Sequence, residues 1–213
     1  MGKSVTWAGH KILEGVIVVE DNVLRLAFEC QRRGTRERRG RGQRGRERAA
    51  APWDRARCYV SDQAHHAVGK ALSLRESYPQ ALILACDQLG ECEGRVLAKP
   101  GTEARAREQL RFLAGKEHRL HNAVALLDAR DGRLLYEMVT SRLRMRPLTG
   151  ERIDRYVELE RPVDSAGSYR SESLGVALFE SMGGDDPTAI IGLPLLWVVI
   201  ALYTARRSHA QKN

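Results

Sequence analysis

The sequence lacks the features that would assign it at once to several common protein classes. Its four cysteines form no CxxC pair and no zinc-like spacing, which favours reduced thiols in a cytoplasmic protein. No apolar run reaches the roughly 20 residues that a membrane span needs, because residues 189–203 are interrupted by Gly192 and Pro194. No P-loop, dinucleotide fingerprint or Ser-His-Asp arrangement is recognisable. We therefore expect a cytoplasmic protein with no membrane partner.

Net positive charge is confined to one segment. The formal net charge of +8 equals the net charge between Gln31 and Arg57, where eleven arginines accompany three acidic residues. Residues 31–61 are rich in Arg and Gly, lack aliphatic periodicity and are expected to be disordered. Few aromatic residues are interleaved with the arginines, so nucleic acid is not expected as the principal partner. The composition divides the chain into a divergent N-terminal segment (1–30), this low-complexity segment (31–61), a folded domain (62–206) and a tail (207–213).

The periodicity of apolar residues predicts helices that alternate with strands around a mixed, twisted sheet, an α/β architecture. Weak strand signals occur at 15–19 and 23–28. The remaining expected elements are a helix in 64–78, a strand at 81–86, a helix from Thr102 to Gly115, strands at 118–127 and 134–146 joined by an Asp131–Gly132 turn, a helix at 149–159, a strand at 176–179 and a final helix introduced by Asp186–Pro187.

Unusual polar residues follow apolar ones in three places. Asp87 and Gln88 come directly after the apolar run 81–86, and Lys99–Pro100 follows within a short glycine-containing excursion. The other two places are 164–172 and 184–194. Taken singly, each has a simple structural explanation as a turn cap, a tight turn or a helix start, and that explanation is favoured. An acid at the end of a buried strand, however, is also how α/β proteins deliver a catalytic group.

In this order and spacing, the polar residues resemble the Maf family of nucleoside triphosphate pyrophosphatases. The resemblance covers about 60% of the chain, from Val68 to Leu202. The residues that carry it are Lys70, Asp87–Gln88, Lys99–Pro100, Ala114–Gly115, Ala166–Tyr169 and Gly192–Pro194. The run AGSYRSESLGVALFE, with Ser171–Glu172, is most similar to the branch of the family that hydrolyses 7-methyl-GTP.

The resemblance implies a single Maf/ITPase-like domain that converts a nucleoside triphosphate to the monophosphate and pyrophosphate. Asp87 would be the general base. Lys70 and Lys99 would neutralise phosphate charge, while Gln88 and Glu172 would discriminate the base. The family uses a divalent cation, Mg²⁺ or Mn²⁺, which Asp87 would help to hold. A homodimer is a further expectation.

The chain departs from the family pattern in residues 1–67. That region contains no Ser-x-Ser-Pro-x-Arg-Arg element, which in the family grips the triphosphate, and only Phe28–Glu29–Cys30 echoes the family. Two explanations compete: a genuine basic arm, or a shifted reading frame in GC-rich DNA, which translation of the other two frames would test. The alternative function is a catalytically impaired Maf-like scaffold whose arginine-rich arm binds nucleic acid or an acidic partner.

Overall fold

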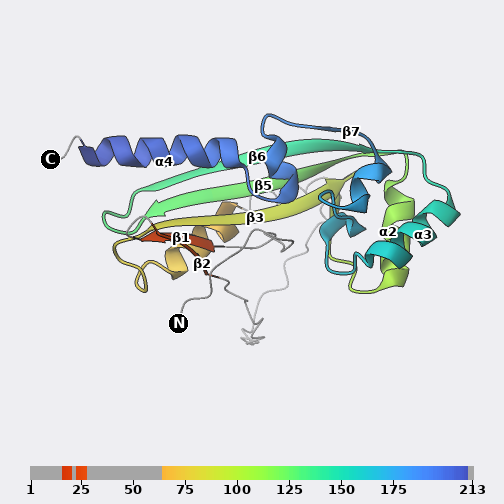
Figure 1. Ribbon diagram of the computed structural model, residues 1–213, viewed down its shortest axis with the longest axis horizontal. Coiled ribbons are helices and arrows are strands. Elements are labelled where there is room, and N and C mark those ends of the chain that lie inside the picture. The colour runs from red at the N-terminus through yellow and green to blue at the C-terminus, as the bar shows by residue number, and fades with distance from the viewer. Residues whose placement is uncertain (1–15, 21–22, 28–63, 211–213) are drawn as a thin grey trace, which may run out of the picture.

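The computed structural model describes residues 16–20, 23–27 and 64–210. Its centre is one sheet in the order β2-β1-β3-β5-β6-β7, with β4 paired to β3 (Figure 1). The strands are β1 (Val16–Glu20), β2 (Val23–Ala27), β3 (Leu82–Cys92), β4 (Arg95–Leu97), β5 (Glu117–Asp128), β6 (Leu134–Met145) and β7 (Phe179–Gly183). The helices are residues 64–73, α2 (Glu103–Leu113), α3 (Gly150–Glu160) and α4 (Leu195–Ala210), with 3-10 turns η1 (Ala166–Ser168), η2 (Leu174–Leu178) and η3 (Pro187–Ile191).

The long β5–β6 hairpin is the framework of the sheet, and it confirms the predicted pair of strands. Its turn closes through hydrogen bonds from Gly132 N to Asp128 O and from Asp128 N to Arg133 O, each 2.8 Å. Gly132 has a φ of 77°, which glycine adopts without strain. The predicted helices α2 and α3 are also confirmed. Their N-caps are Thr102 and Thr149, whose hydroxyls accept hydrogen bonds from the first turn.

The α/β architecture is confirmed, but the expected mixed sheet is wrong for the described residues. All strand pairs among them are antiparallel. The strand expected to end at Cys86 continues to Cys92, because its backbone keeps pairing with β5 as far as Glu91 opposite Arg119. Asp87 and Gln88 therefore lie inside a strand and not beyond its end.

Two expectations near the C-terminus were also wrong. Residues 174–178 form the 3-10 turn η2, and strand β7 starts only at Phe179. Asp186–Pro187 begins η3 and not the final helix, because Gly192 takes a φ of 113° that ends the turn before α4 starts at Leu195. The Asp186 carboxylate nevertheless joins the two elements, since it accepts from Thr188 N at 3.0 Å and from Leu196 N at 2.7 Å.

Helices cover both faces of the sheet, and successive residues of β3 point to opposite faces. On one face, Ala67 and Ala71 of the helix at 64–73 pack near Ile83 and Ala85. On the other face, α4 covers Leu84 and Cys86. At the far end of the sheet, a larger core gathers α2 and α3 around Cys92, Leu120 and Leu143. Figure 1 shows α4 along one end of the sheet and α2 and α3 at the other.

The sequence boundaries relate to this fold in three ways. Strands β1 and β2, from the N-terminal segment, join the sheet through pairing of β1 with β3. Helix α4 runs four residues past 206, to Ala210. The segment 31–61, expected to be disordered, lies outside the described residues, as does the Phe28–Cys30 echo. Within the described part of the chain, no helix has both the length and the apolarity that crossing a bilayer would require.

Candidate active site

A buried carboxylate paired with a partly buried ammonium group marks the centre of the candidate site. Asp87 is 8% exposed, and its Oδ1 accepts a hydrogen bond from Lys70 Nζ at 2.6 Å. Lys70 Nζ also lies 3.4 Å from the backbone oxygen of Cys86, so the ammonium sits against strand β3. Charge-assisted bonds of this kind are stronger than neutral ones and hold both side chains in place. The structure thus brings together two of the predicted site residues, from segments 17 positions apart.

Small side chains explain why Lys70 reaches the strand. Ala67 and Ala71, on the helix, are almost fully buried, and they face Ala85 on β3 and Ala123 on β5. An interface made of methyl groups lets the helix approach the sheet closely. Lys70 is flanked by these two alanines on the helix, so its chain lies along the sheet and delivers its Nζ to Asp87.

Gln88 points to the opposite face, into a small pocket. Its Nε2 donates to Ala189 O at 3.1 Å and to Ile190 O at 3.4 Å. Because two carbonyls hold the amide nitrogen, the orientation of the side-chain amide is fixed, and Oε1 makes no hydrogen bond within the described residues. The pocket is lined by Gln88, Leu120, Ser165, Ala166, Tyr169, Ser171, Glu172, Ile190 and Ile191. The structure therefore places Gln88 and Glu172 at one pocket, as side chains that accept hydrogen bonds.

The two faces meet at a gap in the sheet edge. Strand β1 pairs with β3 over Leu82–Ala85, and β4 pairs with it over Gly90–Cys92. Between these stretches, residues 86–89 have β5 on one side and no strand of the described chain on the other. A ligand lying across this edge could reach the Asp87 side and the Gln88 side at once.

Lys99 is exposed in the loop between β4 and α2 and makes no direct ion pair with Asp87. The chain leaving Leu97 runs antiparallel to β3, in the direction of the gap. Its loop is tied to the pocket side, because Gly101 N donates to Val163 O at 2.8 Å. Gln109 reinforces the tie by donating to Ala98 O at 3.2 Å and accepting from Ser168 Oγ at 2.5 Å.

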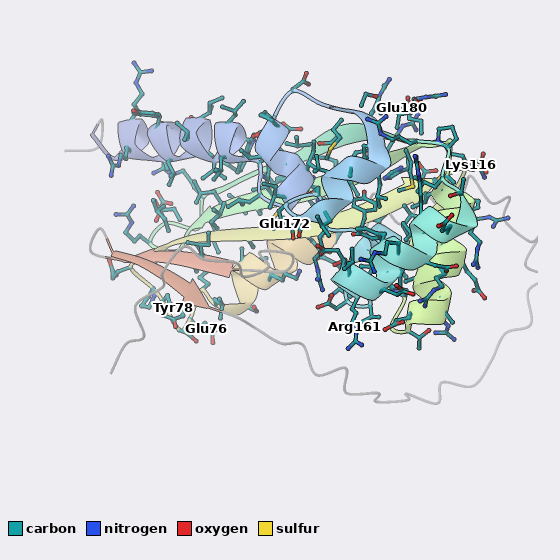
Figure 2. The ribbon with its side chains drawn as sticks, turned by 45° about the vertical axis from the view of Figure 1, so that its right-hand side comes forward. Glu76, Tyr78, Lys116, Arg161, Glu172 and Glu180 are labelled. Carbon is teal, nitrogen blue, oxygen red and sulfur yellow. The ribbon has the colours of Figure 1, made fainter. Side chains whose placement is uncertain are left out.

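Glu172 is the one charged side chain among the residues that line the pocket. It is exposed and lies at the tip of a loop between η1 and η2, near Ser171, whose Oγ is 3.5 Å from its Oε2. In the view of Figure 2, Glu172 stands between the end of the molecule that carries α4 and the end that carries α2 and α3. With no cation in its lining, the pocket suits a group that donates hydrogen bonds or carries positive charge better than it suits a phosphate.

Several residues at the site were not singled out from the sequence. His66 Nδ1 lies 3.4 Å from Asp87 Oδ2. Its position four residues before Lys70 puts both on one helix face, which was the available signal. Asn122 is fully buried and donates to Ala189 O at 2.9 Å, so it shares this acceptor with Gln88. The Oγ of Ser165, in the pocket wall, is buried without a partner among the described residues; the sequence marked its segment, 164–172, but not this residue.

Burial controls the titration of two groups close to the site. It raises the pKa of the Cys86 thiol to about 12, helped by the charge of Asp87, so this cysteine is not a thiolate nucleophile. Its Sγ lies 2.9 Å from Gly192 O. Burial also lowers the pKa of His118 to about 4. His118 is therefore neutral at pH 7, and its Nε2 shares a 2.8 Å hydrogen bond with Tyr169 OH.

The donor set fits a divalent cation that arrives with a phosphate ligand. Among the described residues, no three His, Cys, Asp or Glu side chains gather into a metal cage. Mg²⁺ characteristically uses one or two carboxylates together with substrate phosphates and water. Asp87 supplies one such carboxylate, and its Oδ2 is not bonded to Lys70.

The fold and site together define an α/β domain whose central strand carries an acid–lysine pair on one face and an acceptor-lined pocket on the other. A family model described as "Maf-like protein" matches residues 25–205. The chain therefore belongs to the Maf-like protein family, and the resemblance inferred from the sequence is confirmed.

Several named proteins are similar to this chain. A protein of Cupriavidus pinatubonensis is 45% identical over 129 residues, which cover 61% of this chain and 65% of that protein. One from Aromatoleum aromaticum is 45% identical over 130 residues, 61% of this chain and 67% of that protein. One from Alkalilimnicola ehrlichii is 46% identical over 127 residues, 60% of this chain and 64% of that protein. All three are named "7-methyl-GTP pyrophosphatase", and the chain spans about two thirds of their length.

Proposed function

We propose that this protein is a nucleoside triphosphate pyrophosphatase that prefers 7-methyl-GTP and releases the monophosphate and pyrophosphate. The observation that carries the proposal is the buried Asp87 carboxylate paired with Lys70, in a chain of the Maf-like family. The names of the relatives support the substrate and favour an enzyme over the impaired scaffold that binds through its arginine arm. The proposed setting is the cytoplasm, consistent with the free thiols of Cys86 and Cys92.

Asp87 acts as the general base in this mechanism. Its carboxylate takes a proton from a water molecule, whose oxygen attacks the α-phosphorus as the bond to the bridging oxygen breaks and pyrophosphate leaves. Lys70 holds Oδ1 in place, so that Oδ2 is directed to the water. The ammonium groups of Lys70 and Lys99 offset the negative charge of the phosphates.

A divalent cation, Mg²⁺ or Mn²⁺, completes the proposed phosphate site. Asp87 would hold it together with phosphate oxygens, and the ion would stabilise charge that develops on those oxygens. The alanine interface keeps Lys70 in reach of the same carboxylate. Charge on the phosphates is then balanced from the helix side of β3.

The pocket on the other face would select the base. Methylation at N7 gives guanine a positive charge, and the Glu172 carboxylate is the charged group that lines the pocket. Oε1 of Gln88 offers a fixed acceptor to an N–H donor of the base, because Nε2 is already held by Ala189 O and Ile190 O. The gap at residues 86–89 lets one nucleotide extend from Asp87 to this pocket.

A nucleotide panel tests the proposal. Pyrophosphate release is measured with Mg²⁺ or Mn²⁺ for 7-methyl-GTP, GTP, ATP, CTP and UTP, using the full chain and its Asp87→Asn variant. We expect the highest kcat/KM on 7-methyl-GTP and a loss of about 10²- to 10⁴-fold in the variant. Asp185→Asn, an exposed carboxylate outside the site, is the matched control and should retain activity. Turnover that survives Asp87→Asn, or no turnover of any nucleotide, would overturn the proposal.

A homodimer is part of the proposal. Helix α4 exposes Leu196, Ile200 and Tyr203, which are 55%, 65% and 66% accessible. A contiguous apolar patch of this kind often marks an interface between protein chains. Light scattering on the purified chain should give twice the monomer mass, and a monomer across the micromolar range would contradict this point.

A further inference from the structure

The loop that presents Glu172 is held by residues that do not line the pocket. Glu172 is exposed and has no ion-pair partner among the described residues. Its position therefore depends on the backbone on either side of it. The residues that fix this backbone are Arg170, two positions before it, and Ser173, directly after it.

Arg170 anchors the first side of the loop to the C-terminal end of α3. Its Nη1 donates to Glu160 O at 2.7 Å and lies 3.5 Å from Glu160 Oε2, while its Nη2 donates to Asp164 Oδ1 at 3.0 Å. A cation is favourable at the carbonyl end of a helix. The backbone N–H of Arg170 adds a 3.0 Å hydrogen bond to Tyr156 OH.

Glu160 holds the second side of the loop. Its Oε1 accepts from Ser173 Oγ at 2.6 Å and from Leu174 N at 3.4 Å. The Glu160 side chain is 10% exposed and that of Arg170 is 25% exposed, so this pair is shielded from water more than a typical surface ion pair. The same carboxylate thus contacts the loop both before and after Glu172.

The loop also folds back so closely on itself that one of its positions has no room for a side chain. A Cβ added at Gly175 would lie 2.2 Å from Arg170 O, so the chain returns onto itself at this point. The loop is therefore closed by Gly175 and clamped by Glu160 and Arg170. Such a clamp restricts the positions that the Glu172 carboxylate can occupy.

We infer that Arg170 and Glu160 are positioning residues that determine base selectivity through Glu172; this inference rests on the proposed function. Neither residue is among those that line the pocket. Their effect is to keep the carboxylate at the pocket, where it distinguishes a cationic base from a neutral one. A pre-organised contact gives more discrimination than one that must be ordered on binding.

The test compares selectivity and not activity alone. The ratio of kcat/KM for 7-methyl-GTP to that for GTP is measured in Arg170→Met, Arg170→Lys, Glu160→Gln, Glu172→Gln and the Arg170→Met/Glu172→Gln double variant. We expect Arg170→Met to lower the ratio about tenfold, as Glu172→Gln does, and the double variant to lower it no further, because the residues act through one group. Arg170→Lys should recover part of the ratio, since it keeps the charge but loses the fork.

A purely structural role predicts a different result. It would lower turnover of both nucleotides in parallel with the melting temperature and leave the ratio unchanged, which would overturn the inference. Independent, additive losses in the double variant would also overturn it. Arg144→Met is the matched control, because Arg144 makes an exposed 2.9 Å ion pair with Glu180 away from this loop. If Arg170→Met does not fold, Glu160→Gln and Arg170→Lys provide the same comparison.

A binding measurement separates this inference from the proposed function. Calorimetry on the Asp87→Asn background gives the affinity ratio for 7-methyl-GTP and GTP without turnover. A wild-type chain with no turnover, but with preferential binding that Arg170→Met abolishes, would refute the proposed reaction and support the clamp. Preferential turnover that persists in Arg170→Met would support the reaction and refute the clamp. A chain with neither turnover nor preferential binding would refute both.

Discussion

The two faces of strand β3 carry opposite kinds of polar group. On the face covered by the helix at 64–73, Asp87 is buried and paired with Lys70. On the face covered by α4 and η3, Gln88 is neutral, is tied to backbone carbonyls and shares a pocket with the exposed Glu172. One face therefore holds a compensated charge, and the other leaves a carboxylate available to a ligand.

Under the proposed function, this difference separates two tasks of a nucleotide hydrolase. A fixed, buried acid with its own cation suits proton transfer next to phosphates, where geometry governs the rate. A solvent-facing carboxylate on a clamped loop suits discrimination between ligands of different charge. Changes on the Asp87 face should therefore alter turnover of every nucleotide, and changes on the Gln88 face should alter the choice among them.

The largest effect is expected from Lys70→Met, which removes the ion pair with Asp87 on the first face. Asp87 would lose its cation while staying buried, because the alanine interface around it is unchanged. We expect kcat/KM to fall about a hundredfold on all nucleotides alike. Chemical denaturation should show a loss of about 2 kcal/mol, typical of a buried charged group left without its partner. A selective loss on one nucleotide would contradict the division between the faces.

Lys116→Met is the matched control for this variant. Lys116 Nζ also pairs with a carboxylate, Glu93, at 2.9 Å, but these side chains are 34% and 60% exposed, against 17% and 12% for Lys70 and Asp87. Figure 2 shows Lys116 at the end of the molecule that carries α2 and α3. Its loss should leave turnover unchanged, as exposed ion pairs contribute little.

The next largest effect is a dependence of folding stability on pH, which arises on the Gln88 face of the sheet. His118 lies on the same side of β5 as Asn122, and burial lowers its pKa from 6.5 to about 4. The unfolded chain therefore binds more protons between these values, so stability is full above pH 6.5 and falls as the pH drops towards 4. The loss amounts to about 3 kcal/mol over this window.

Urea unfolding at several pH values measures this slope. His118→Gln, which keeps a hydrogen-bonding group near Tyr169 OH without titrating, should flatten the slope. A slope that survives in His118→Gln would assign the acid sensitivity to other groups.

A smaller and more selective effect is expected from Glu172→Gln. Removing the one charge in the pocket lining should lower kcat/KM for 7-methyl-GTP about tenfold and leave turnover of unmethylated nucleotides nearly unchanged. Steady-state kinetics on the two substrates give the result. An equal loss on every nucleotide would show that the two faces do not divide their tasks in this way.

The smallest effect is expected from Lys99→Met. Lys99 is exposed, and its loop contacts the pocket side through Gly101 and Gln109. Because a solvated charge contributes modestly to phosphate binding, we expect KM to rise a few-fold for all nucleotides with little change in kcat. A loss as large as that of Lys70→Met would place Lys99 within the reacting centre.

The sequence predicted the fold best where local signals and long-range packing agree. Thr102 and Thr149 cap helices as expected, and the Asp131–Gly132 turn closes the predicted hairpin. It failed where backbone pairing continued through polar residues. The end of the apolar run predicted that the strand stops before Asp87, yet its pairing with β5 extends to Glu91. The change from apolar to polar residues at this point of β3 reflects which elements cover each face of the sheet. Those elements come from distant parts of the chain.

The sequence named candidate site residues, but it did not predict how they are arranged. Motif positions alone identified the candidate residues Lys70, Asp87, Gln88, Lys99 and Glu172. Motif positions do not say to which face of the sheet each side chain points. Once Asp87 and Gln88 are known to be in a strand, alternation requires them to point apart. The clamp around Glu172 could not be predicted, because Glu160 and Arg170 have ordinary charged side chains until α3 and the loop are packed together.

The alternation of β3 has a consequence for how this sequence tolerates change. The two sides of the strand are assigned by whether a position is odd or even, and the pairings with β1 and β5 fix that parity. Substitutions between Leu82 and Cys86 preserve it, whereas the deletion of a single residue there would exchange the sides of Asp87 and Gln88. Insertions or deletions that this strand tolerates should therefore involve two residues. Insertions or deletions of one residue should be tolerated only outside the strand, at the turns.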